Sequence, residues 1–351
     1  MGILRFARGA NYRGFYEKLK VIAKKKRIPA PLLFIDGAFS ALVFGSGLQD
    51  YLNYEFYDRS LSERSAYATI RVQQKLYDRV NPRELRHFFA SKAEFYKKYR
   101  DYMNRLMFIP DEGDAAGLKD FLSKARDFIE KPLSGTGGKG IVIKNAGDIR
   151  EVPKYFEKLR SEKIILEELI VQHPDLSRLC PRCVNTLRIM TSVADPEKPV
   201  IIYAALRVGD GRHDVDNFHS GGMGMLVNSE TGRVEGDAFD KDVVRYSSHP
   251  VTGEKFDGFQ IPFWDRTREL VLSASGVIPE MTVVGWDVAI TPSGPVLVEG
   301  NSTPGFDMIQ VDYGRGRKDI ADDVMKTYKN RRGSGGKGQY TSRRKADENA
   351  S

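Results

Sequence analysis

The sequence predicts an α+β fold that follows a mainly helical N-terminal region. Helix signals dominate residues 1–102, where Asn81-Pro82 is the clear breaker after Ser60. Beyond Gly117 the pattern changes to short apolar runs separated by glycine-rich or helical stretches, which is typical of mixed α and β structure. A chain of 351 residues has room for one large domain or for two to three ordinary ones.

The individual elements follow from local signals along the chain. Residues 1–30 are either a basic amphipathic helix or a loose arm. A helix is expected from Ser60, because Ser60 and Glu63 have capping-box spacing, and a second helix is expected from Pro82 to about Tyr102. Further helices are expected at 148–160 and 263–275, and strands at 126–130, 140–144, 163–167, 187–193, 200–208, 224–227, 283–290 and 296–299.

These signals divide the chain into four parts. Residues 1–84 form the helical region, 85–170 a first α+β subdomain with a glycine-rich loop, and 171–330 a second subdomain. The tail, 331–351, is rich in Gly, Ser and Lys and is expected to be disordered.

The net charge of +8 is concentrated at the two ends of the chain. Residues 1–30 carry nine Lys or Arg and one acid, and residues 315–351 carry eleven and five, so the 284 residues between them have a net charge of −6. A nucleic-acid-binding body is therefore not expected. The basic ends are either solvated faces or contacts with an anionic membrane or a protein partner.

Apolar runs and cysteine content indicate a cytoplasmic protein. The longest apolar candidate for a membrane span, 31–44, is broken by Asp36 and Gly37, and no secretory signal is recognisable. Cys180 and Cys183 have CxxC spacing without a second pair, so neither zinc nor a redox role is expected. The sequence fixes no oligomeric state.

The first candidate site is the glycine-rich stretch 131–141, which lies between two apolar runs. Glycines allow backbone N–H groups to surround an anion, and Lys131 at the end of a strand supplies a point charge for phosphate. The stretch matches neither GxxxxGK[ST] nor GxGxxG, so a flexible hairpin remains an equal reading.

The second candidate is a pair of C-terminal strands. Asp287 lies in the first, Glu299 ends the second, and Asn301 follows two residues later on the same face. A hairpin through 291–294 would place Asp287 beside them. Two carboxylates and an amide oxygen suit magnesium. The competing reading is an exposed hairpin with chance acids, although such charges in apolar strands are costly unless paired.

A third set of polar residues lies between these two candidates. Glu167 and Glu168 end an apolar strand, Arg188 and Arg207 lie in strands, and 217–222 is polar and glycine-rich. Each is unremarkable alone, since a polar residue on a strand usually marks its solvated face.

In this order, the three sets resemble the ATP-grasp superfamily over residues 85–310. The resemblance rests on Lys131 with its loop and on Asp287, Glu299 and Asn301 followed by Ser-Thr-Pro-Gly. The whole pattern is most similar to the sugar-transfer-associated ATP-grasp proteins and is related to glutamate and peptide ligases. It implies an ATP-grasp fold, in which two α+β subdomains clasp ATP.

The resemblance implies a role for each matching residue. Lys131 would hold the α- and β-phosphates, Lys92 resembles the earlier lysine that contacts ATP, and the loop residues Ser134, Gly135, Gly137 and Gly138 would close over the phosphates. The adenine hinge would be Glu167, Glu168, Leu169 and Ile170, with Asp175 at the ribose. Magnesium would lie on Asp287, Glu299 and Asn301, and the catalytic side chains would be Arg188, Arg207, Asn217 and His219.

The function that the resemblance implies is an ATP-dependent carboxylate–amine ligase, an enzyme that uses ATP and Mg²⁺ and passes through an acyl phosphate. Its substrates would be a small-molecule or peptide carboxylate and an amine, in cell-surface polysaccharide or peptide and natural-product biosynthesis. The alternatives are a small-molecule kinase and a non-catalytic ATP-binding accessory protein. Substrate identity does not transfer, because the helical N-terminal region replaces the small α/β domain of the peptide ligases.

Overall fold

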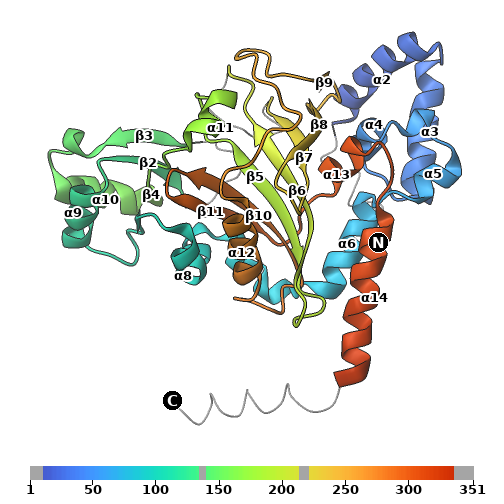
Figure 1. The fold of residues 1–351 in the computed structure, drawn as a ribbon. Coiled ribbons are helices and arrows are strands. Elements are labelled where there is room, and N and C mark those ends of the chain that lie inside the picture. Colours follow the sequence, from blue (N-terminus) through green and yellow to red (C-terminus); the bar gives the residue numbers. More distant parts are fainter. Residues whose placement is uncertain (1–10, 134–139, 213–220, 336–351) are drawn as a thin grey trace. The chain divides into compact units, whose positions relative to one another are not determined.

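The computed structural model describes residues 11–133, 140–212 and 221–335 (Figure 1). Contacts divide the chain into two compact units. The terminal unit comprises Met1–Val80, Ser192–Pro199 and Gly305–Ser351, and the central unit comprises Asn81–Thr191 and Val200–Pro304.

The described part of the terminal unit is mainly helical, which confirms the predicted helical N-terminal region. Its elements are α2 (Tyr12–Lys26), α3 (Ala30–Val43), α4 (Leu48–Asn53), η1 (Phe56–Asp58), α5 (Leu61–Ser65), α6 (Ile70–Val80), α13 (Asp307–Asp312) and α14 (Lys318–Gly335). The helix α14 packs along α6 and extends past residue 331, where the tail was expected to begin. Residues 336–351 lie outside the described residues.

The single helix expected from Ser60 is wrong. Ser60 and Glu63 do form the predicted capping box, but α5 ends at Ser65 and α6 starts at Ile70. Between them the backbone of Ala68 is held by two buried amides. Gln310 Oε1 accepts from its N–H at 2.7 Å, and Gln73 Nε2 donates to its carbonyl at 2.6 Å. These side-chain hydrogen bonds take the place of helical ones and stabilise the break.

The helix expected from Pro82 to Tyr102 is also divided. The central unit begins with η2 (Arg83–Leu85), α7 (His87–Ala90) and α8 (Lys92–Met103). Ser91 is extended and its hydroxyl caps α8 by accepting from Glu94 N at 3.4 Å. This N-cap starts a new helix where sequence periodicity indicated a continuous one.

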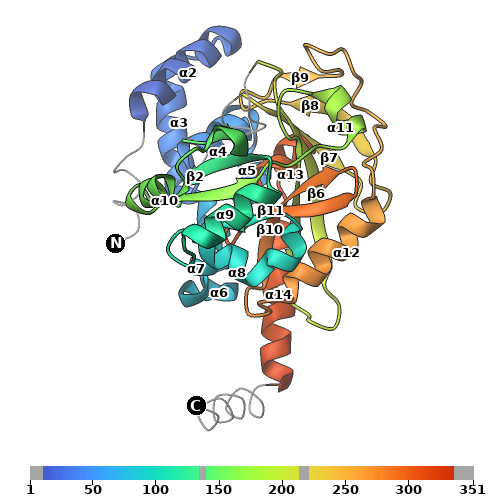
Figure 2. The same ribbon diagram turned by 90° about the vertical axis from the view of Figure 1, so that its left-hand side faces the viewer.

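A four-stranded antiparallel sheet, in the order β1-β4-β2-β3, forms the first part of the central unit. Its strands are β1 (Met107–Phe108), β2 (Asp127–Pro132), β3 (Val142–Asn145) and β4 (Ile164–Glu168). The helices α9 (Ala115–Lys124) and α10 (Val152–Ser161) lie together against it (Figures 1 and 2). Fully buried side chains of this core include Leu118, Phe128 and Leu159.

A seven-stranded sheet, in the order β11-β10-β5-β6-β7-β8-β9, forms the second part. The strands are β5 (Thr186–Ser192), β6 (Val200–Val208), β7 (Met223–Val227), β8 (Val234–Phe239), β9 (Arg245–Tyr246), β10 (Val283–Thr291) and β11 (Gly294–Asn301), accompanied by α11 (Pro174–Leu179) and α12 (Trp264–Ser275). Trp286 is fully buried, with its Nε1 donating to Thr191 Oγ1 at 2.9 Å. Within the described residues, no helix is both long and apolar enough to span a bilayer.

Candidate active site

The glycine-rich stretch joins two paired strands of the smaller sheet. β2 and β3 pair antiparallel, with Glu130 opposite Val142, so these two strands form a hairpin. Lys131 is the penultimate residue of β2, as predicted. Ser134, Gly135, Gly137 and Gly138 lie outside the described residues. The position of Lys131 fits both readings, a phosphate loop and a plain hairpin.

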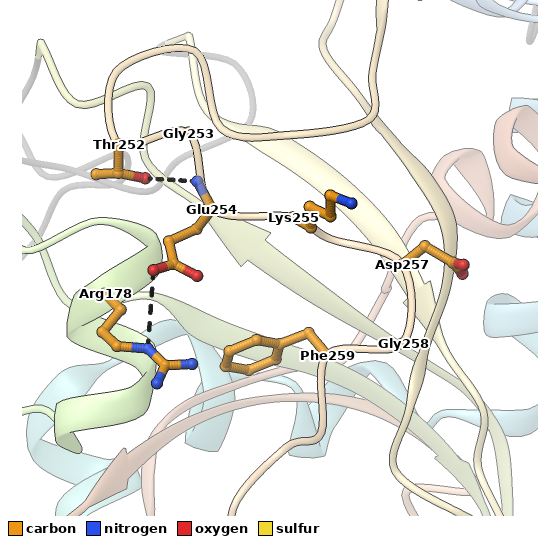
Figure 3. A pocket seen from close by; sticks show the side chains of 8 residues that line it. All are labelled: Arg178, Thr252, Gly253, Glu254, Lys255, Asp257, Gly258 and Phe259. Carbon is orange, nitrogen blue, oxygen red and sulfur yellow. Dashed lines mark hydrogen bonds and ion pairs between the residues drawn. The ribbon is translucent and has the colours of Figure 1, made fainter.

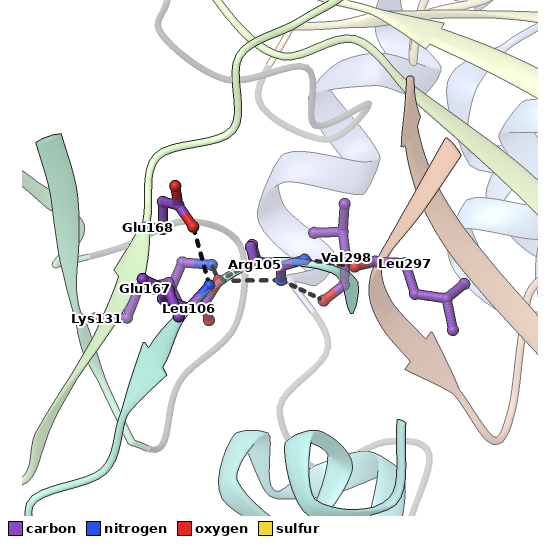
Figure 4. A network of polar contacts seen from close by, with 7 residues as sticks. All are labelled: Arg105, Leu106, Lys131, Glu167, Glu168, Leu297 and Val298. Atoms are coloured by element: carbon purple, nitrogen blue, oxygen red, sulfur yellow. Dashed lines mark hydrogen bonds and ion pairs between the residues drawn. The ribbon is translucent and has the colours of Figure 1, made fainter. Parts of the chain in front are cut away.

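Glu167 is at the centre of a buried charge network (Figure 4). Its Oε2 accepts from Lys131 Nζ at 2.9 Å and from Arg105 Nη2 at 3.1 Å, and its side chain is only 4% exposed. Burial by itself raises the pKa of this carboxyl, but the two cations outweigh burial and lower it. The Glu167 side chain is therefore an ionised partner of Lys131.

Arg105 is a residue that the sequence analysis missed. Besides Glu167 in β4, it donates to the backbone carbonyls of Leu297 and Val298 in β11 (Figure 4). One buried guanidinium thus ties the four-stranded sheet to the edge of the seven-stranded sheet. An arginine just before a short apolar run, residues 106–109, carries no sequence signal for this role, because its partners lie 62 and 192 residues away.

The predicted hinge, residues 167–170, consists of the last two residues of β4 and the first two of the connector that leaves the smaller sheet. Glu168 accepts from Leu106 N at 3.0 Å through its side chain, and Leu169 N donates to the Asp127 carbonyl at 3.0 Å. Leu169 and Ile170 are partly exposed. The connector then joins the larger sheet.

Asp175 is not in the hinge connector. It lies in the first turn of α11, where its carboxylate is 3.7 Å from His173 Nδ1 and 3.9 Å from Arg178 Nη1. These local contacts give no support to the ribose role that the resemblance implied for it.

Lys92 lies beside Lys131. Its ammonium donates to the carbonyl of Pro132 at 3.2 Å. Burial and the neighbouring Lys131 charge lower the pKa of Lys92, whereas Glu299 and Glu167 act in the opposite direction. The α8, β2, β4 and β11 elements therefore bring two lysines and two glutamates within one electrostatic neighbourhood.

The C-terminal hairpin has the predicted register. Asp287 in β10 is directly opposite Glu299 in β11, and the turn is closed by the pair Thr291 and Gly294. Asn301 is two residues beyond Glu299 and therefore shares its face of the strand. The intervening Gly300 faces the aromatic core, where a Cβ would lie 2.8 Å from the rings of Phe89 and Phe95.

Two arginines bind Asp287, one from the adjacent strand β5 and one from β6, the next strand of the sheet. Arg188 in β5 donates from Nε to Oδ1 at 2.6 Å and from Nη2 to Oδ2 at 3.2 Å, and Arg207 in β6 donates from Nη2 to Oδ2 at 2.8 Å. Burial opposes ionisation of Asp287, but both guanidinium groups lower its pKa. The structure thus brings together three predicted site residues and keeps Asp287 ionised.

Glu299 has the opposite electrostatic environment. Removal of its carboxyl from bulk solvent and the adjacent Asp287 carboxylate raise its pKa, and Arg188 and Arg207 only partly offset this. The residue as a whole is nonetheless exposed, so solvent still reaches Glu299. A cation placed between Asp287 and Glu299 would relieve this repulsion, so the oxygen donors of Asp287, Glu299 and Asn301 fit a magnesium ion.

The other predicted residues, and the two cysteines, make no described contact with the Lys131 or Asp287 clusters. Asn217 and His219 lie outside the described residues. Cys180 and Cys183 are buried with their sulfur atoms 3.8 Å apart, and the part of the chain that is described contains no group of three or more His, Cys, Asp or Glu arranged to hold a metal.

An open depression of about 460 Å³ lies elsewhere in the central unit, between α11 and the segment 252–259 (Figure 3). Arg178 and Glu254 face each other across it at 3.9 Å. No residue that lines it belongs to the predicted site, and its exposed ion pair lacks the buried, converging charges of the Lys131 and Asp287 clusters.

Comparison with known families shows to which family the chain belongs. The family model described as sugar-transfer associated ATP-grasp matches residues 71–326. The chain belongs to this ATP-grasp family. The α+β ATP-grasp fold that the sequence predicted is confirmed, and the match starts within α6, before the first residue of the central unit, Asn81.

Solved structures of ATP-grasp ligases are similar to this family member, at low identity. ATP-grasp ligase PsnB complexed with a minimal precursor, Mg and ADP is 13% identical, with a TM-score of 0.40 over 71% of this chain and 62% of that one. D-cycloserine synthetase DcsG is 12% identical, with a TM-score of 0.43 over 80% and 82%. D-alanine–D-alanine ligase from Bacillus anthracis is 12% identical, with a TM-score of 0.40 over 71% and 70%. No curated protein matches the chain.

Proposed function

We propose that this ATP-grasp protein is an ATP-dependent carboxylate–amine ligase that forms an amide bond through an acyl phosphate. The observation that carries the proposal is the convergence of two lysines, Lys92 and Lys131, with the paired acids Asp287 and Glu299 in one unit. Lys92 is the first residue of α8, which packs on the Glu299 strand β11, and its ammonium donates to the carbonyl of Pro132, the neighbour of Lys131. Phosphoryl transfer needs such a combination of phosphate-binding cations and hard oxygen ligands.

The nucleotide is assigned to the smaller sheet and its connector. Lys131 and Lys92 hold the phosphates, and the backbone of 167–170 receives the adenine. In the described structure Lys131 is paired with Glu167, which fixes its position between β2 and β4. A lysine held in this way loses less conformational entropy when it binds phosphate than a free side chain does.

Magnesium is assigned to Asp287, Glu299 and Asn301. When bound, it supplies positive charge that offsets the repulsion between the phosphates and an incoming carboxylate. Asp287 is already ionised and oriented by Arg188 and Arg207, so it needs no proton release to act as a ligand. Glu299, with its raised pKa, does need to lose a proton whenever it is protonated.

The reaction proceeds in two transfers. A substrate carboxylate oxygen attacks the γ-phosphorus of ATP, the bond to the β-phosphate oxygen breaks, and ADP leaves. The amine nitrogen then attacks the acyl carbon, the acyl C–O bond breaks, phosphate leaves and the nitrogen loses a proton. Arg188 is placed to stabilise the transferring phosphoryl group, since its guanidinium lies on the metal ligand Asp287.

Phosphate release tests this function. The purified protein is incubated with MgATP and pools of amino acids, acidic sugars and amines, and phosphate is measured with and without each pool. We expect pool-dependent phosphate release by the wild type and its loss in Glu299→Gln. The matched control is Glu269→Gln, an exposed residue on α12, which keeps activity.

Two results would reject the ligase. ADP formed together with a phosphorylated product and no free phosphate identifies a kinase. Tight ATP binding without turnover in any pool identifies an accessory nucleotide-binding protein.

A further inference from the structure

Helix α3 of the terminal unit turns its polar side chains toward the interior of the unit and most of its apolar side chains toward solvent, the opposite of an ordinary surface helix. Its one ionisable residue, Asp36, points inward, where it accepts from Arg64 Nη1 at 2.7 Å and from the Tyr51 hydroxyl at 2.8 Å. Ser40 on the same inner face accepts from Arg64 Nη1 at 2.9 Å. The internal ion pair fixes which face of α3 is turned outward.

The outward face of α3 is entirely apolar. The exposed positions between 31 and 43 are Pro31, Leu32, Phe34, Ile35, Ala38, Phe39, Leu42 and Val43. Leu32, Ile35 and Leu42 are 56%, 62% and 60% exposed, and with Phe39 they form a stripe at helical spacing. Single exposed apolar side chains are ordinary, but a helix face without any polar group marks an interaction surface.

Helix α2 places positive charge along the edge of this stripe. It packs against α3 (Figures 1 and 2) and carries six Lys or Arg against one Glu. The Tyr16 ring contacts Phe34 at 6.1 Å between centroids, and Lys20 Nζ lies 5.4 Å from the Tyr16 ring centroid. Lys24 follows Lys20 one turn later. The apolar stripe, an aromatic border and a basic rim therefore follow one another across the α2–α3 pair.

We propose that the α2–α3 pair is a docking surface for an anionic phospholipid bilayer. In this arrangement the Leu32, Ile35 and Leu42 side chains enter the acyl boundary, Tyr16 lies at the headgroup level, and Lys20 and Lys24 face the lipid phosphates. These are the components of interfacial helices that lie on a membrane without crossing it.

The chemistry of the surface favours lipid over a protein partner. The outward face of α3 offers no side chain that could form a hydrogen bond to a protein partner. The hydrocarbon of a bilayer needs no hydrogen-bonding partner. The positive charge of α2 complements anionic headgroups. A second copy of this chain would bring the same basic rim against itself, because a two-fold interface pairs identical patches.

Vesicle co-sedimentation of the full chain tests the proposal. Vesicles of phosphatidylcholine alone are compared with vesicles that also contain phosphatidylglycerol. The apolar variant is Ile35→Ser with Leu42→Ser, and its matched control is Val244→Ser with Val251→Ser, two exposed valines in the central unit. Circular dichroism and thermal unfolding confirm that each variant is folded.

A second pair of variants tests the basic rim. Lys20→Gln with Lys24→Gln removes two charges beside the stripe, and Lys119→Gln with Lys154→Gln removes two exposed charges in the central unit. Light scattering on a sizing column gives the oligomeric state of every protein.

We expect the wild type to bind the anionic vesicles and to lose binding as salt is raised. Each α2–α3 variant should lower the partition coefficient by about tenfold or more, while the controls stay within about twofold of wild type. No binding to anionic vesicles, or equal binding to both vesicle types, would overturn the proposal. A wild-type dimer that Ile35→Ser with Leu42→Ser converts to a monomer would also overturn it, because the surface would then be a self-association site.

Discussion

Replacing Asp287 with asparagine removes a negative charge that two buried arginines share. The side chains of Arg188, Arg207 and Asp287 are 17%, 13% and 5% exposed, so water screens this cluster weakly. Asparagine keeps the shape and one acceptor oxygen but leaves both guanidinium groups without their carboxylate. We therefore expect Asp287→Asn to reduce the free energy of unfolding.

The magnitude follows from the burial of the pair. Breaking a buried ion pair by removing one partner costs about 3–5 kcal/mol. Because asparagine retains one acceptor, the lower end, about 3 kcal/mol, applies here. For a folding unit of this size each kcal/mol lowers Tm by about 2–4 °C, so a fall of about 6–12 °C is expected.

The pH dependence gives an independent check. The pKa of Asp287 is lowered on folding, so its contribution to stability is fully present above the ordinary aspartate pKa and is lost as pH falls through the folded value. The difference between wild type and Asp287→Asn should be constant from about pH 6 to 8 and should shrink below about pH 4.

Urea unfolding at several pH values measures this difference, with Asp101→Asn as control. Asp101 is 90% exposed and pairs loosely with Arg100 at 3.7 Å, so its replacement should change stability by less than about 0.5 kcal/mol. A neutral-pH loss below about 1 kcal/mol for Asp287→Asn, or a difference that persists unchanged in acid, would refute the reasoning.

Three further predictions concern single side chains. Arg105→Met leaves two backbone carbonyls and a buried carboxylate short of donors, so urea unfolding should show a loss of about 2–4 kcal/mol, and an unchanged midpoint would contradict the bridge. Because the pKa of Glu299 is raised, Mg²⁺ binding should release protons at pH values just above the ordinary glutamate range. Calorimetry in buffers of different ionisation enthalpy should detect that release in wild type and lose it in Glu299→Gln; equal release by both would assign the proton elsewhere. Gln310→Ala leaves the N–H groups of Ala68 and Arg317 without their acceptor, at a cost of about 2 kcal/mol, with faster hydrogen exchange at both amides. Unchanged exchange there would show that Gln310 does not hold the break between α5 and α6.

Local patterns were enough to predict most of the strands. Each predicted strand has a counterpart within a few residues, because apolar runs bounded by glycine or polar residues reflect sheet burial directly. β8, Val234–Phe239, was missed because Glu235, Gly236 and Asp237 interrupt its apolar character. Helix α3 lies in the region predicted to be helical, but its bounds were not predicted, because almost every residue of 30–43 is apolar and no polar face alternates with an apolar one.

In the candidate site, too, contacts between residues close in sequence were predictable and contacts between distant residues were not. The approach of Asp287 to Glu299 was predictable, since both lie in one tight hairpin and strand residues alternate between faces. Arg188 and Arg207 reach Asp287 because the order of the strands in the sheet places β5 and β6 next in line after β10. In the sequence they are 99 and 80 residues away from Asp287, so local patterns do not predict these contacts. The role of Arg105 also depends on a contact between residues far apart in sequence, which no local sequence pattern predicts.

The most direct test of carboxylate activation at this site follows oxygen atoms. Carboxylate substrates labelled with ¹⁸O in both carboxyl oxygens are supplied with MgATP and an amine pool, and the released phosphate is analysed by mass spectrometry. An acyl phosphate that the amine attacks at carbon leaves one labelled oxygen in each phosphate, and Glu299→Gln abolishes the signal. Turnover that releases unlabelled phosphate, or label that appears only in a phosphorylated product, would contradict the proposed ligase.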